Sequence, residues 1–274
     1  MNASKRPQVE AFFLPGGKDN IFAVFFAPIN PKGTSIIYVP PFGEEANRCR
    51  AIAAQQAREF AKNGYGCLLI DPYGTGDSAG ELKNATWDIW QKDITAAANW
   101  LEQKTSGNLI LWGIRLGALL ATSVANQNPA LFKQLIFWQP VLDGKIYLTQ
   151  VLRQRIISLQ ERNEPAETTA QMMEKLANGQ PIEVAGYTLV EALTTDIKNT
   201  AFKHFKQFDP INIAWLETIV QEDNTLSIAS QRAIEHMTSL GVSVKPELII
   251  SPPIWTLQKR TEAPTLIETT MTVI

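Results

Sequence analysis

Residues 109–118 read LILWGIRLGA, and this stretch contains the junction that decides the fold. The apolar run that ends at Trp112 is typical of a buried strand, and Leu116–Gln127 has the pattern of a helix. Between them, two glycines flank Arg115 at positions two before and two after it. Glycines at this spacing let a strand and the following helix approach each other closely around a tight turn. The stretch therefore predicts a strand, a sharp turn at Arg115 and a helix.

The same alternation of short apolar runs and helical patterns extends over most of the chain. Two N-terminal runs joined by residues 16–20 (GGKDN) predict a β-hairpin, and the later strands are separated by crossover helices, which predicts a mostly parallel sheet with helices on both faces. Strands are expected at Val9–Pro15, Ile21–Pro28, Ser35–Val39, Tyr65–Ile70, Leu109–Trp112, Leu135–Trp138, Ile213–Val220 and Leu248–Ser251, and helices at Asn47–Asn63, Trp87–Leu101, Leu116–Gln127, Leu226–Leu240 and Ala263–Thr270.

Residues 143–208 interrupt this alternation. They are richer in polar residues and mostly helical in pattern, with no clear succession of strand and helix. We expect a helical cap inserted into one core domain, so that residues 1–142 and 209–274 form the core and residues 143–208 form the cap.

Composition limits the classes of function. The chain has 274 residues, 45% of them hydrophobic, and a formal net charge of −2, which favours a soluble globular protein over a nucleic-acid-binding one. No run of 18 apolar residues is present, so no membrane span is expected, and the N-terminus does not resemble a secretory signal. Two cysteines, Cys49 and Cys67, fit reduced thiols in the cytoplasm better than a disulfide. We expect no metal and no cofactor, while the oligomeric state stays open.

The segment from Gly113 to Gly117 resembles the nucleophile elbow, G-x-S-x-G, of the α/β-hydrolases, and the resemblance extends over nearly the whole chain. It implies an α/β-hydrolase fold with an N-terminal antiparallel hairpin and a helical cap. It also implies that the attacking serine belongs at position 115, where this sequence has an arginine.

A literal G-x-S-x-G occurs elsewhere, at Gly76–Gly80, with Ser78 in its centre. This segment lies several residues beyond its strand, and no helix begins directly after it, whereas an elbow needs both neighbours. We therefore expect a structural loop, with Ser78 only a secondary candidate for a nucleophile.

The other triad positions follow from the chain order of the resembled family, which is nucleophile, acid, histidine. The acid is expected after the strand that ends near Val220, at Glu222 or Asp223. No histidine follows the last strand, because the only two are His204, within the cap, and His236, within a predicted helix. Trp255 stands in the loop where the resemblance implies the histidine.

The loop after the third strand also differs from the resembled family. Pro40 and Pro41 occupy the place of the His-Gly pair of related hydrolases, and proline has no N–H to bind an oxyanion. Donors are therefore expected only from Phe42 onward and from the N–H of Leu116. The predicted ligand-binding residues are Phe42, Gly43, Glu44, Arg115, Leu116 and Trp255.

Arg115 has three interpretations. It can form an internal ion pair with an acid from the same edge of the sheet, it can anchor an anionic ligand at a helix N-terminus, or it can act directly in catalysis. The last is the weakest, because arginine stays protonated and is a poor base. The candidate acids are Glu44, Glu45, Asp77, Glu222 and Asp223.

The strings VPPFGEEANRCR, DPYGTGDSAG, WGIRLGALLA and PPIWT, with EAPTLIETT, resemble the exosortase A system-associated hydrolase 2 family. This resemblance implies a role beside the exosortase and exopolysaccharide machinery of Gram-negative bacteria. Three functions remain open: a non-classical or inactive member that binds an anionic small molecule, an active ester or acyl hydrolase or acyl transferase that uses a nucleophile such as Ser78 or Cys49, and a scaffold of the export machinery.

Overall fold

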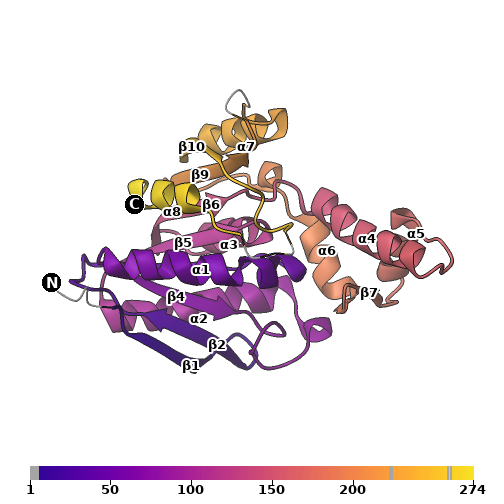
Figure 1. Cartoon of the computed structure of the whole chain (residues 1–274), viewed down its shortest axis with the longest axis horizontal. Helices are drawn as coiled ribbons and strands as arrows, with labels where there is room; N and C mark the ends of the chain where they lie inside the picture. Colours follow the sequence, from indigo (N-terminus) through magenta and orange to yellow (C-terminus); the bar gives the residue numbers. More distant parts are fainter. Residues whose placement is uncertain (1–5, 222–224, 258, 260) are drawn as a thin grey trace.

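The computed structural model describes residues 6–221, 225–257, 259 and 261–274 (Figure 1). Within them, the central sheet has the strand order β1-β2-β4-β3-β5-β6-β9-β10. β1 and β2 form the predicted hairpin, β2 pairs antiparallel with β4, and the other neighbours are parallel. The strands are β1 (Val9–Pro15), β2 (Asn20–Phe26), β3 (Thr34–Val39), β4 (Gly66–Asp71), β5 (Asn108–Ile114), β6 (Phe132–Trp138), β9 (Asn212–Ile219) and β10 (Ser243–Ile250).

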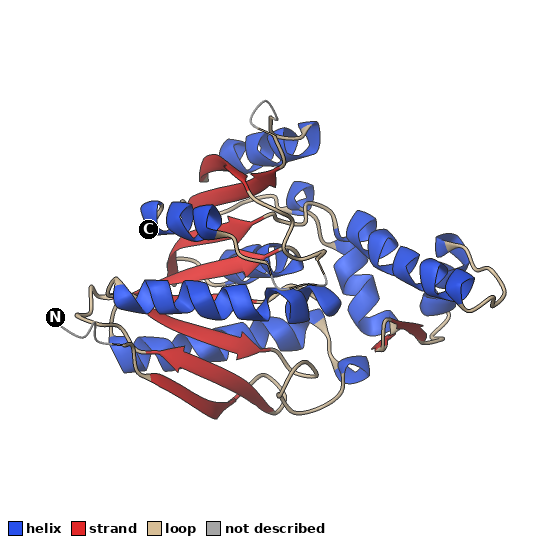
Figure 2. Cartoon of the chain, viewed as in Figure 1, coloured by secondary structure: helices blue, strands red, loops and turns tan. Residues whose placement is uncertain are grey.

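Helices cover both faces of the sheet, as Figure 2 shows. One face carries α1 and α8, whose buried residues share a core with Trp112 and Trp138, and the other carries α2, α3 and α7. The central strands are therefore buried on both sides, which explains their continuous apolar runs. The helices are α1 (Glu44–Lys62), α2 (Trp87–Thr105), α3 (Leu116–Gln127), α7 (Ile228–Ser239) and α8 (Pro264–Thr272), with a short 3₁₀ helix at Leu82–Asn84.

The segment between β6 and β9 projects from the end of the sheet to which the parallel strands point (Figure 2). Its two ends lie together, because Asp143 and Ala201 form an isolated β-bridge and Lys203 Nζ lies 2.8 Å from Asp143 Oδ2. The segment contains α4 (Gly144–Glu161), α5 (Thr169–Ala177), β7 (Ile182–Val184), β8 (Tyr187–Leu189), α6 (Glu191–Asn199) and a 3₁₀ helix at Phe202–His204.

Three elements differ from the sequence-based expectation. α1 begins at Glu44 and not at Asn47, because the negative charges of Glu44 and Glu45 in its first turn are attracted to the positive end of the helix dipole and stabilise an earlier start. The cap contains the hairpin β7–β8, whose turn residues Ala185 and Gly186 both have positive φ; alanine at the first of them conceals the turn in the sequence. β10 begins at Ser243 and includes Pro246, which an edge strand tolerates because one side of its backbone has no partner strand.

Among the described residues, no helix is both long and apolar enough to cross a lipid bilayer.

Candidate functional site

Arg115 lies in the sharp turn between β5 and α3, as predicted. Its backbone has φ 55° and ψ −119°, a conformation that a non-glycine residue rarely adopts. The turn is fixed on both sides, because the Arg115 N–H donates to Trp138 O at 3.0 Å and the Val141 N–H donates to Arg115 O at 3.1 Å. The strand-turn-helix geometry therefore presents the side chain of residue 115 at the carboxyl edge of the sheet.

The two glycines of this turn are required by close packing. A Cβ atom on Gly113 would lie 2.5 Å from Ala118 Cα, and one on Gly117 would lie 2.2 Å from Val39 O. Both contacts are with backbone, which cannot move aside as a flexible side chain can. The sequence-based reason for these glycines is thus confirmed.

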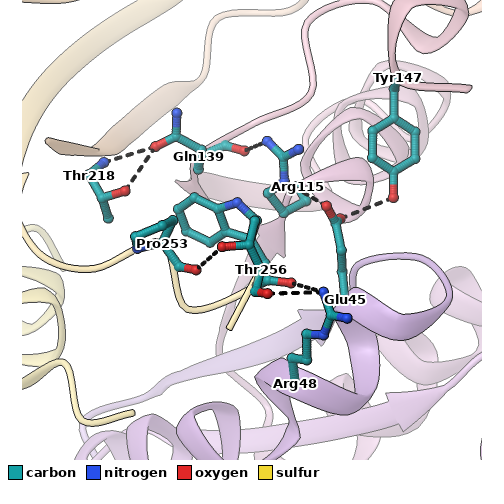
Figure 3. A network of polar contacts seen from close by, with 9 residues as sticks. Glu45, Arg48, Arg115, Gln139, Tyr147, Thr218, Pro253 and Thr256 are labelled. Carbon is teal, nitrogen blue, oxygen red and sulfur yellow. Dashed lines mark hydrogen bonds and ion pairs between the residues drawn. The ribbon is translucent and has the colours of Figure 1, made fainter. Parts of the chain in front are cut away.

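The guanidinium of Arg115 forms an ion pair with Glu45 of α1 (Figure 3). Nε lies 3.2 Å from Glu45 Oε1, and one terminal nitrogen donates to Gln139 O at 3.3 Å. Both charged side chains are largely buried, at 15% exposure for Arg115 and 14% for Glu45. Of the three candidate acids that lie within the described residues, Glu44, Glu45 and Asp77, the partner of Arg115 is Glu45.

Two aromatic rings complete the surroundings of this cation. The guanidinium carbon lies 5.4 Å from the ring centre of Trp255 and 5.8 Å from that of Tyr147, within the range of cation–π attraction. Tyr147, from α4 of the cap, also donates its hydroxyl to Glu45 Oε2 at 3.0 Å. Trp255 thus packs on Arg115, where the sequence analysis expected it to contact a ligand.

Burial shifts the pKa of both the Glu45 carboxyl and the Tyr147 hydroxyl. It raises the pKa of Glu45 above its ordinary value, although Arg115 and the Tyr147 hydroxyl oppose the shift. It also raises the pKa of Tyr147 well above the usual range, and the neighbouring Glu45 adds to that shift.

Two further groups hold the network in place (Figure 3). Gln139 has a positive φ of 44°, and its side-chain oxygen accepts from the N–H of Thr218 at 2.9 Å, which ties the end of β6 to β9. Arg48 of α1 donates to the carbonyl oxygens of Trp255 at 3.3 Å and Thr256 at 3.2 Å. The sequence did not point to Gln139 as a site residue. Its one relevant feature in the sequence is that it directly follows the strand predicted to end at Trp138.

A pocket that is open to solvent lies beside the turn, and we name it the elbow pocket. The predicted binding residues Phe42, Gly43 and Leu116 line it, together with Leu82, Trp90, Leu120 and Tyr187. The other three predicted binding residues, Glu44, Arg115 and Trp255, are not among its lining residues. Glu44 instead accepts hydrogen bonds from Tyr187 of the cap and from Asn47, both at 3.1 Å.

One residue that lines the elbow pocket has an unused backbone donor. Leu116 is the first residue of α3, and in the described part of the chain its N–H has no hydrogen-bond acceptor. A helix N-terminus of this kind attracts a carbonyl or anionic oxygen.

Of the two alternative nucleophiles, Ser78 is engaged in hydrogen bonds and Cys49 is buried. Ser78 donates its hydroxyl to the carbonyl oxygen of Asp71 and accepts from the Phe22 N–H at 2.7 Å, so it ties the loop to the hairpin. Cys49 is a buried free thiol, and burial raises its pKa to about 12. Cys67 is likewise buried and free.

The remaining triad candidates contribute no base to the described site. His204 Nδ1 lies 2.8 Å from Asn199 O, and His236 Nε2 lies 2.9 Å from Phe205 O, so each pairs with a backbone carbonyl away from Arg115. Glu222 and Asp223, the predicted acids, lie outside the described residues. Over the described ranges, no three His, Cys, Asp or Glu side chains are grouped as metal ligands.

The sequence pattern of the family described as "Serine aminopeptidase, S33" matches residues 31–202, more than half of the chain. Similar curated proteins include the mitochondrial palmitoyl-protein thioesterases ABHD10 of Bos taurus, 28% identical over 116 residues (42% of this chain, 36% of that protein), and of Mus musculus, 30% identical over 116 residues (42% and 37%). The matched segment thus spans little more than a third of these relatives.

Solved structures share the fold over almost the whole chain. Mouse ABHD10 superposes with a TM-score of 0.58 at 16% identity, covering 96% of this chain and 98% of that one. Est1E of Butyrivibrio proteoclasticus with bound ferulic acid superposes with a TM-score of 0.65 at 14% identity, covering 96% and 97%. These similarities confirm the predicted α/β-hydrolase fold. By its family match and its fold, the chain belongs to the serine aminopeptidase S33 family of α/β-hydrolase proteins.

Proposed function

We propose that this protein is a non-classical member of its family, which binds an anionic or acyl small molecule in the elbow pocket and does not hydrolyse it through a serine at the elbow. The observation that carries the proposal is the Arg115–Glu45 ion pair, at 3.2 Å, in the turn between β5 and α3.

The chemistry of the side chains supports the absence of standard hydrolysis. A guanidinium stays protonated and has no lone pair with which to attack a carbonyl carbon. A serine nucleophile also needs a base that takes its proton and later gives it to the leaving group. The chain has two histidines, and each pairs with a backbone carbonyl outside the site.

The residues that line the pocket favour an acyl ligand. Its walls include Phe42, Leu82, Trp90 and Leu120, which favour an apolar chain. Leu116 also lines the pocket, and its N–H at the start of α3 can donate to a carbonyl or carboxylate oxygen. The palmitoyl-protein thioesterases among the relatives act on an acyl group by their name, which favours the same ligand class here.

A hydrolase or acyl transferase with another nucleophile is the alternative. Two observations disfavour it: the Ser78 hydroxyl is engaged as both donor and acceptor, and the Cys49 thiol is buried. The setting in exopolysaccharide metabolism, the cytoplasmic location and a scaffold role at the export machinery rest on the motif resemblance and composition alone, and we keep them as proposals.

The test has two parts. A fluorophosphonate probe should leave every serine of the native protein unlabelled, and p-nitrophenyl esters should be cleaved at the rate seen without protein. Stoichiometric labelling of one serine would overturn the proposal.

Octanoate should bind with saturation in ligand-observed NMR titrations. Ala46→Phe should abolish this binding, because Ala46 lines the pocket. Ala51→Phe, at an exposed position on the same helix, is the matched control and should leave it unchanged. Equal octanoate binding by the two variants would show that octanoate does not occupy the elbow pocket, and would contradict the proposal.

A further inference from the structure

A second hollow adjoins the elbow pocket, between the cap and the start of α1, and we name it the cap crevice. Its core side includes Glu44 and Glu45 of α1, and its cap side includes Val151 of α4, Val184 of β7 and Leu189 of β8. The cap side of this crevice therefore offers an apolar surface, as the elbow pocket does.

The two hollows have a wall in common. Phe42, Gly43 and Tyr187 line both of them. Phe42 is held in the core, with 7% exposure and with its ring centre 6.0 Å from that of Trp90. Gly43 has no side chain and has a positive φ of 61°. Of the three, only Tyr187 belongs to the cap, and its ring is the part of the shared wall that a movement of the cap side chains can displace.

Tyr187 is fixed across the boundary between cap and core. Its hydroxyl accepts from Asn47 Nδ2 at 3.0 Å and donates to Glu44 Oε1 at 3.1 Å, both on α1. Its ring lies over Gly43, 3.8 Å from the place that a Cβ atom on that residue would take. The residue directly follows the tight turn at Ala185 and Gly186, so its backbone position is set by the β7–β8 hairpin.

This placement bears on the length of a bound apolar chain. A chain that fills the elbow pocket meets the Tyr187 ring before it can reach Val151 and Leu189 in the cap crevice. Each methylene group that a longer chain buries tightens binding by about fourfold, so the ring withholds a gain that the crevice would otherwise provide. To pass, the chain must displace a ring that two hydrogen bonds hold.

We propose that Tyr187 is a specificity-determining residue, which separates the elbow pocket from the cap crevice and limits the ligand to an apolar chain that ends within the elbow pocket. The inference rests on the proposed function, since the elbow pocket is taken to hold the acyl chain. It narrows the ligand class from acyl compounds in general to those of short or medium chain length.

The experiment compares octanoate with dodecanoate by ligand-observed NMR titration of the full chain, below the micelle concentration of both. The two probes have the same carboxylate and differ by four methylene groups. In the wild type, dodecanoate should bind within about threefold of octanoate, because the additional methylene groups are not buried. In Tyr187→Ala, dodecanoate should bind at least about tenfold tighter than in the wild type, while octanoate should change by less than about threefold.

Two variants serve as controls. Tyr187→Phe keeps the ring and loses the hydrogen bonds to Glu44 and Asn47, so it should retain the wild-type ratio of the two dissociation constants. Thr188→Ala changes the next residue of β8, which lines neither hollow, and should leave the binding of both probes unchanged. Thermal unfolding of each variant shows whether it is folded, and the wild-type ratio tests the inference without any substitution.

The outcomes separate the inference from the proposed function. If octanoate binds but Tyr187→Ala keeps the wild-type ratio, Tyr187 does not limit the chain, and the proposed function stands. A wild type that binds dodecanoate more than about tenfold tighter than octanoate contradicts the inference in the same way. If Tyr187→Phe behaves as Tyr187→Ala does, the assignment to the ring is wrong. If neither probe binds the wild type, the proposed function fails and the inference fails with it.

Discussion

Arg115 and Glu45, seventy positions apart in the chain, meet with 3.2 Å between Nε and Oε1 at the carboxyl edge of the sheet. Their burial makes the pair sensitive to the loss of either member, because a charge left alone in this environment has no compensation from water. Tyr147 binds the second oxygen of Glu45, so the cap takes part in the same arrangement.

Arg115→Met should therefore lower the free energy of unfolding by about 2–4 kcal/mol, since Glu45 would remain buried without its partner. The double variant Arg115→Met/Glu45→Gln should recover part of that loss. Urea unfolding of the four proteins in the cycle measures the coupling. Lys92→Met, which breaks the exposed Lys92–Asp88 pair, is the control and should cost less than about 0.5 kcal/mol. A cost for Arg115→Met no larger than that of the control would contradict the prediction.

Arg115→Ser should not produce an efficient esterase, although it places a hydroxyl at the turn. The reason is that both histidines pair with backbone carbonyls, His204 with Asn199 O and His236 with Phe205 O, whereas general-base assistance contributes about 10²–10⁴ in rate. The measurement is kcat/KM with short p-nitrophenyl esters, and Arg115→Ala is the matched control without a hydroxyl. A serine variant that exceeds the alanine variant by more than about 100-fold would show that another group supplies the base.

The stability of the protein should depend on pH through Glu45. Burial raises the folded-state pKa of this carboxyl above 4.5, its ordinary value, so the folded state binds the proton more tightly than the unfolded state. Relative to Glu45→Gln, the wild type should therefore lose free energy of unfolding as the pH rises from 4.5 through the folded-state pKa, and the difference should then level off.

Removal of Arg115 extends that dependence, because Arg115 lowers the Glu45 pKa. In Arg115→Met the loss should continue to higher pH than in the wild type. Denaturant unfolding at a series of pH values checks both curves, and a difference that grows in favour of the wild type with rising pH would reverse the assigned sign.

Cys49 should not react in the native protein. Its thiol is buried and its pKa is raised to about 12, so little thiolate is present at pH 8. A chromogenic disulfide reagent should modify Cys49 only after unfolding, at the rate of the unfolding step. Rapid native modification, mapped to Cys49 by mass spectrometry, would return it to the list of possible nucleophiles.

Gly117→Ala should destabilise the fold by about 3 kcal/mol or more, because the added Cβ would overlap the carbonyl oxygen of Val39. Gly179→Ala provides the comparison. Unlike Gly117, that glycine has a positive φ, of 75°, and among the described residues no atom beyond its chain neighbours lies within 4 Å of an added Cβ. Backbone strain alone should then cost about 1–2 kcal/mol. Equal losses in thermal unfolding would show that the close approach at Gly117 does not matter.

Local pattern was enough to predict most of the fold. The buried strands, the N-terminal hairpin and the C-terminal helix that became α8 follow from apolar periodicity and glycine placement. The misplaced start of β10 and the overlooked β7–β8 hairpin are cases where the residues do not favour a strand by themselves. There, pairing with a neighbouring strand decides the conformation.

The sequence by itself determined that an arginine occupies the turn after β5, that glycines surround it, and that no histidine follows β10, since these are facts of residue identity and order. Only the tertiary structure decided that Glu45 binds Arg115 and that Trp255 and Tyr147 flank it. The physical reason is that the site is made of residues that are far apart in the sequence and meet only in the folded chain. Parallel strands bring loops from distant parts of the chain to one edge of the sheet, and the choice among several equivalent acids depends on distances that no local pattern contains.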